Sequence, residues 1–164
     1  MSPLLSILAR ALDLQDFERW RPRVIAWLAF VAALLVAYWT GWFIDRSAIA
    51  GGSGASYYEF EQAFPLADGW LLLTVVLAAV QLLRRRPTAL LALCAAGSAA
   101  LYLFGMDVLY DLQHGIYANS NGGLTELAIN ILSVASGAMA LCWSWRNREA
   151  LLGGARPNRR LTAG

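Results

Sequence analysis

The sequence predicts an all-α integral membrane protein built as a bundle of four transmembrane helices. Hydrophobic residues make up 59% of the chain and charged residues only 15%, a far more apolar balance than in soluble domains. Four apolar stretches are long enough to cross a hydrocarbon core of ~30 Å as helices. They cover residues 24–44, 66–83, 88–115 and 124–145. Little chain remains between them, so residues 1–164 are predicted to form a single membrane domain.

The basic residues predict how these spans are oriented. All 13 of them are Arg, and all but Arg46 lie at span ends that share one side of the membrane. The positive-inside rule therefore predicts that both termini are cytoplasmic. Abundant alanine is typical of a high-GC bacterial genome, so we expect a multi-pass protein of a bacterial inner membrane. Because topology explains the Arg clusters, they give no reason to expect nucleic-acid binding.

The segments outside the spans also carry signals. Residues 3–21 begin with Pro3 and continue with a leucine stripe, which predicts a short amphipathic helix on the inner membrane surface. The stripe consists of Leu4, Leu5, Leu8 and Leu12. The outer loop, residues 45–65, is glycine-rich at first and then aromatic and acidic. We expect its second half to fold over the outer end of the bundle as a lid. Residues 146–164 are predicted to be a cytoplasmic tail.

The third and fourth spans carry stripes of small residues at matching depth, over residues 95–100 and 133–138. Helices in membranes associate where small residues let their backbones approach each other. We therefore expect these two spans to pack closely. The residues between them, 118–123, are typical of a turn.

Polar residues gather near the outer ends of the spans. Counting ~1.5 Å per residue from the cytoplasmic Arg groups places four of them in one layer: Asp68, Asp107, Glu126 and Asn130. Asp107, Asp111 and His114 stand at i, i+4 and i+7, so they share one helix face and extend this layer. Ionisable residues inside a membrane are costly and usually functional. The layer is therefore the predicted site, with Glu59 and Glu61 as lid groups.

Helix-end capping and ligand binding are two interpretations of this layer. Asp68 and Glu126 suit first turns, where the helix dipole favours carboxylates, but Asp107 and Asp111 lie near a C-terminal end, where it does not. As a binding site, the layer would take a cation or a lipid-like molecule. Oxygen and imidazole ligands suit a divalent metal such as Mn²⁺, Fe²⁺ or Zn²⁺, and the oxygens alone suit Ca²⁺. The predicted metal ligands are Asp107, Asp111, His114 and Glu126, and Asn130 would join the carboxylates around Ca²⁺.

An enzyme is the third interpretation. Asp107 and Asp111, one turn apart, would share a proton and perform acid–base chemistry on a lipid, quinone or terpenoid, with His114 as a proton shuttle. The chain has no Walker, GxSxG or CxxC motif that would name a reaction. A structural or assembly subunit of a membrane complex is the remaining alternative. Homo-oligomerisation also stays open, since four short helices seldom enclose a pore alone.

Overall fold

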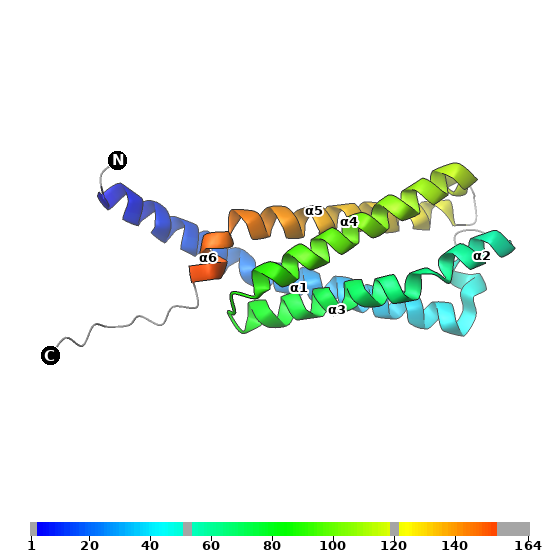
Figure 1. The fold of residues 1–164 in the computed structure, drawn as a ribbon, viewed down its shortest axis with the longest axis horizontal. Coiled ribbons are helices and arrows are strands. Elements are labelled where there is room, and N and C mark those ends of the chain that lie inside the picture. Colours follow the sequence, from blue (N-terminus) through cyan, green and yellow to red (C-terminus); the bar gives the residue numbers. More distant parts are fainter. Residues whose placement is uncertain (1–2, 51–53, 119–121, 154–164) are drawn as a thin grey trace.

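The computed structural model of the chain describes residues 3–50, 54–118 and 122–153, with side chains from residue 16 onward. Every element in this part of the chain is helical (Figure 1). The elements are α1 (Pro3–Ile49), α2 (Ala55–Glu61), α3 (Phe64–Leu83), α4 (Ala89–His114), the 3₁₀ helix η1 (Ile116–Ala118), α5 (Gly123–Arg146) and α6 (Arg148–Gly153). Four helical stretches are long and apolar enough to cross a membrane. This confirms the predicted all-α class and its four long apolar helices.

The helix bounds follow the apolar stretches of the sequence closely. Helices α3, α4 and α5 each begin and end within one turn of the predicted spans. Helix α4 ends at His114 and is capped by Gly115, whose left-handed backbone (φ 65°) suits a glycine after a helix C-terminus. Parts of the predicted loop and turn, at residues 51–53 and 119–121, lie outside the described residues, as do residues 154–164 of the tail.

Helix α1 is longer than any segment that the sequence predicts. It runs without interruption through Pro22, where a boundary between an interfacial helix and the first span was expected. Its one non-helical residue is Asp45, at a kink near its C-terminal end. In Figure 1 the N-terminal part of α1 extends beyond the bundle. The location of residues 3–21 on a membrane surface stays a prediction, and the leucine stripe lies outside the described side chains.

The long helices pack in the order α1, α3, α4 and α5, and in the described chain the first and the last do not close the ring. Helix α1 packs against α3, α3 against α4, and α4 against α5. In the described part of the chain, no Cα atom of α1 lies within 8 Å of one in α5. Side chains do bridge these two helices among the described residues: the Trp27 indole N–H donates a hydrogen bond to Ser136 Oγ at 3.2 Å, and the Phe17 ring stacks on that of Trp143 with ring centroids 5.5 Å apart. The bundle therefore leaves space between α1 and α5.

The backbones of α4 and α5 approach each other directly where the two helices cross. A Cβ atom added to Gly97 would lie 3.0 Å from the carbonyl oxygen of Gly137, and one added to Gly137 would lie 3.0 Å from that of Gly97. Each added atom would also lie 2.8 Å from a leucine Cγ, of Leu141 and Leu101 respectively. The predicted packing of the two small-residue stripes is thus confirmed.

Candidate functional site

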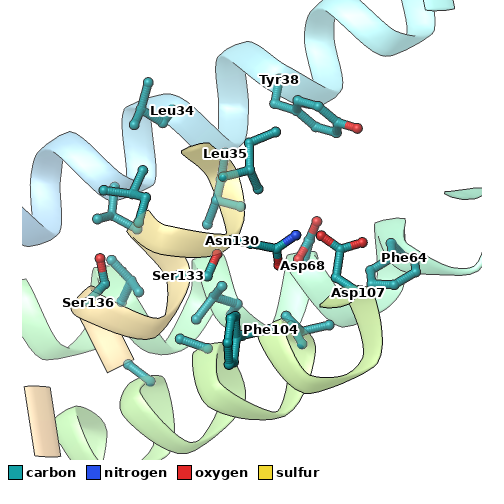
Figure 2. A pocket seen from close by; sticks show the side chains of 18 of the residues that line it. Leu34, Leu35, Tyr38, Phe64, Asp68, Phe104, Asp107, Asn130, Ser133 and Ser136 are labelled. Atoms are coloured by element: carbon teal, nitrogen blue, oxygen red, sulfur yellow. The ribbon is translucent and has the colours of Figure 1, made fainter. Parts of the chain in front are cut away.

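A cavity of about 450 Å³ lies among α1, α3, α4 and α5. Apolar side chains form most of its wall, among them Leu28, Val31, Leu71, Val75, Ala96 and Ala100. One end is polar, and there it is lined by Tyr38, Glu61, Asp68, Asp107, Glu126 and Asn130. Figure 2 shows Asp68, Asp107 and Asn130 converging at this end, with Ser133 and Ser136 farther along α5. The cavity therefore joins a long apolar space to a cluster of carboxyl groups.

Three carboxyl groups meet at the polar end. One oxygen each of Asp107, Asp111 and Glu126 lies within 4.8 Å of the other two. Asp111 and Glu126 are only 2% and 4% exposed, whereas Asp107 is half-buried beside the cavity. We call these three residues the carboxyl cluster. The expectation that the third and fourth spans bring Asp107 and Glu126 to one depth is confirmed.

The local sequence explains how α5 reaches α4 at this point. Glu126 lies in the first turn of α5, and the helix begins at the buried Gly123. A Cβ atom there would lie 2.6 Å from the carbonyl oxygen of Ile116 and 2.7 Å from that of Tyr117. Only glycine allows this approach of the α5 start to η1. The approach brings Glu126 beside the last turns of α4.

Asn130 connects the cluster to η1. Its Nδ2 donates hydrogen bonds to Asp111 Oδ2 and to the Tyr117 hydroxyl oxygen, each at 3.0 Å. The side chain is 2% exposed, and its Oδ1 has no hydrogen-bond partner. Because the amide nitrogen is the donor and must face the Asp111 carboxylate, the amide oxygen is the atom without a hydrogen bond among the described residues. Burial raises the pKa of Tyr117 to about 12, and the charge of Asp111 adds to this shift.

Aromatic side chains donate to one carboxyl group of the cluster and to two others nearby. Tyr57, in the lid helix α2, donates to Glu126 Oε1 at 2.9 Å. On α1, the Tyr38 hydroxyl donates to Glu61 Oε2 at 3.2 Å and the Trp39 indole N–H to Asp68 Oδ2 at 2.9 Å. The lid is held in place by stacking, since the Phe60 ring lies 3.7 Å from that of Tyr110. Helix α2 thus contacts the ends of both α4 and α5.

Asp68, Asp107 and Asp111 are not balanced by a basic side chain of any described residue. Among the described residues, the ion pairs join Glu18 to Arg21 and to Arg85, near the opposite ends of the helices. Asp68, Asp107 and Asp111 form no ion pair with any described residue. Buried charges of one sign require compensation, by protons or by a bound cation. The site is therefore built to accept positive charge or hydrogen-bond donors.

Two of the predicted site residues lie outside this arrangement. His114 is exposed, its ring stacks on Tyr110 at 4.0 Å, and its Nδ1–H donates to the Tyr110 carbonyl oxygen at 2.9 Å. It occupies the last residue of α4, beyond the level of Glu126. Glu59 is also exposed, whereas Glu61 is buried and lines the cavity. The structure does not bring His114 or Glu59 to the carboxyl cluster.

Three tyrosines of the site were not predicted as site residues. Tyr38, Tyr57 and Tyr117 come from α1, the lid and η1, and each contacts a site side chain. Their positions in the sequence follow no common spacing with the acids. In a membrane protein, interfacial tyrosines are common for other reasons. Only the tertiary structure distinguishes these three.

Fold and site together define a class: an all-helical protein, with four helices suited to a membrane, that encloses a cavity ending in buried carboxyl groups. No protein-family model, curated protein or solved structure matches the chain. Its function is therefore inferred from the site.

Proposed function

We propose that this chain is a bacterial inner-membrane protein that binds a lipid-like molecule in the cavity. The apolar part of the ligand lies between the helices, and its polar head meets Asp68, Asp107 and Glu126. The observation that carries this proposal is the continuity of one cavity with apolar walls and a carboxyl-lined end. Its volume of about 450 Å³ lies within the range of small-molecule sites, roughly 300–1,000 Å³.

The open side of the bundle supports a ligand that comes from the bilayer. Because the backbones of α1 and α5 come no closer than 8 Å between Cα atoms of the described residues, the cavity lies behind a gap between two helices with exposed apolar side chains. Leu34 lines the cavity and is nevertheless 39% exposed on α1. A molecule dissolved in the membrane reaches such a space without crossing water. The Trp27–Ser136 hydrogen bond and the stacked rings of Phe17 and Trp143 bridge this gap.

The charge distribution supports an orientation with both termini in the cytoplasm. Exposed Arg84, Arg85 and Arg86 follow α3, and Arg146 ends α5. The carboxyl cluster lies at the other ends of these helices. Under the positive-inside rule, the polar end of the cavity then faces the outer leaflet.

Acid–base catalysis on the bound molecule is the second candidate function. The observation that favours it is the half-buried Asp107 beside the cavity, with Asp111 and Glu126 directly behind it. A carboxyl group in that position can exchange a proton with a ligand head. This candidate predicts that the purified protein converts its bound molecule, and that Asp107→Asn keeps the molecule unconverted.

Mass spectrometry of bound lipids tests the binding proposal. Wild-type protein, purified in detergent and washed extensively, is expected to retain a discrete apolar molecule at about one per chain. Ser133→Phe places a ring into the cavity from α5 and should remove it. Ala138→Phe, on the exposed face of the same helix, is the matched control and should retain it. Absence of a discrete molecule from wild type, or equal retention by both variants, would contradict the proposal.

A further inference from the structure

The carboxyl cluster has a second feature that a lipid-like ligand alone does not explain. Three carboxyl groups share one small volume, and two of them are nearly inaccessible to solvent. We infer that Asp107, Asp111 and Glu126, together with Oδ1 of Asn130, form a site for one divalent cation of the size of Ca²⁺. The cation would occupy the polar end of the cavity, so this assignment rests on the proposed function in treating that end as a binding site.

The separation of the oxygens selects the size of the ion. Calcium binds oxygen ligands at about 2.3–2.6 Å, so two of its ligands lie no more than about 5 Å apart. The cluster oxygens lie within 4.8 Å of one another and satisfy this limit as they stand. Magnesium binds at about 2.0–2.1 Å, so its ligands lie no more than about 4.2 Å apart. Calcium, whose bonds to oxygen are longer, therefore requires less approach of the three carboxyl groups than Mg²⁺ does.

The unpaired amide oxygen points independently to a cation. Asn130 is 2% exposed and lines the cavity, yet its Oδ1 accepts no hydrogen bond from any residue that the structure describes. Leaving a buried acceptor unsatisfied costs about 1–3 kcal/mol. The same amide donates to Asp111 through Nδ2, so Oδ1 belongs to a group that contacts the cluster. An amide oxygen is a frequent calcium ligand, and a bound cation would satisfy it.

The remaining hydrogen bonds orient the proposed ligands. Tyr57 donates to Oε1 of Glu126, and Asn130 donates to Oδ2 of Asp111. Such donors fix the orientation of a carboxylate, as outer-shell partners do in metal sites. Every proposed ligand atom is an oxygen, since His114 lies elsewhere. This donor set favours a hard cation over Zn²⁺ or Fe²⁺.

Calorimetric titration of chelator-treated protein in detergent with CaCl₂ tests the site. Wild type is expected to bind one Ca²⁺ per chain and to prefer it to Mg²⁺ at least tenfold. Asp107→Asn and Asp111→Asn should each lower the affinity for Ca²⁺ by at least about 10- to 100-fold. This is the loss typical of removing an outer-shell partner, and removing a ligand should cost no less. Tyr57→Phe should weaken it by about tenfold. The unfolding temperature of each variant, measured without metal, shows whether it is folded.

Two exposed acceptors provide matched controls. Glu59→Gln and His114→Gln should bind Ca²⁺ as wild type does, because neither side chain reaches the cluster. Absence of saturable binding to folded wild type would overturn the inference, as would unchanged binding in Asp107→Asn. If Asp111→Asn fails to fold, Asp107→Asn decides, since its side chain is only half-buried. The lipid measurement with Ser133→Phe is separate, so a missing cation does not count against the lipid-like ligand.

Discussion

Asn130 holds two parts of the site together through one amide group. It joins α5 to Asp111 on α4 and to Tyr117 on η1, and it is almost fully buried while doing so. A buried hydrogen bond contributes little by itself, but a buried acceptor that loses its donor is costly. Removal of the amide would leave both an aspartate oxygen and a phenol oxygen without this donor.

We therefore expect Asn130→Leu to destabilise the metal-free protein by about 1–3 kcal/mol, although leucine has nearly the same size. Asn147→Leu is the control, because Asn147 also donates one hydrogen bond, at 2.8 Å to the Trp143 carbonyl, at the half-buried end of α5. Its loss should cost less than about 1 kcal/mol. Unfolding in detergent, followed by circular dichroism, measures both. Equal losses would show that the Asn130 amide has no special role.

At this scale the sequence predicts which acids meet but not what surrounds them. Depth along a helix follows from a fixed rise per residue, so Asp107, Glu126 and Asn130 could be placed in one layer. The direction of a side chain beyond the last packed turn does not follow from helix geometry. His114 shares a face with Asp107 on an ideal helix, yet it turns onto Tyr110 because nothing packs over it there.

At the scale of the helices, α4 and α5 form the frame on which the cluster is built. Gly97 and Gly137 let their backbones approach, and the hydrogen bond from Asn130 to Asp111 joins the same two helices nearer the carboxyl end. Stripes of small residues indicate such a crossing in the sequence because few other features of membrane helices explain them. The uninterrupted course of α1 through Pro22 was harder to predict. A proline in a helix interior usually ends or kinks the helix, yet Pro22 lies well inside α1.

The crossing predicts opposite effects for two glycines of α4. In Gly97→Ala the new Cβ would meet the Gly137 carbonyl oxygen at 3.0 Å, which forces the helices apart. We expect a loss of about 1–3 kcal/mol in the free energy of unfolding. Gly105→Ala meets no atom within 4 Å and should gain up to about 1 kcal/mol from helix propensity. Thermal unfolding of the two variants decides, and a stabilised Gly97→Ala would exclude a tight crossing.

At the scale of the whole molecule, charge and hydropathy are arranged along the bundle rather than around it. Large apolar side chains such as Phe30, Leu73, Leu91 and Ile131 are exposed, which water would disfavour and lipid would not. Arginines follow α3 and end α5, and the carboxyl cluster lies near the other helix ends. The fold class was predictable because the bilayer alone sets how long and how apolar a membrane-spanning helix must be. The open side between α1 and α5 was not, since it depends on which helices become neighbours.

This arrangement predicts that α2 and the α3–α4 connection lie on opposite sides of the membrane. Ser56 and Thr88 are both exposed, and each can be replaced by cysteine with little change in shape. In a background with Cys94→Ala and Cys142→Ala, a membrane-impermeant maleimide added to intact bacterial cells should label Ser56→Cys. Thr88→Cys, beside the Arg84–Arg86 group, should react only after permeabilisation, because that group is retained in the cytoplasm. The reverse labelling pattern would mean that the protein has the opposite orientation and that the polar end of the cavity faces the cytoplasm. Labelling of both sites in intact cells would mean that α3 does not cross the membrane.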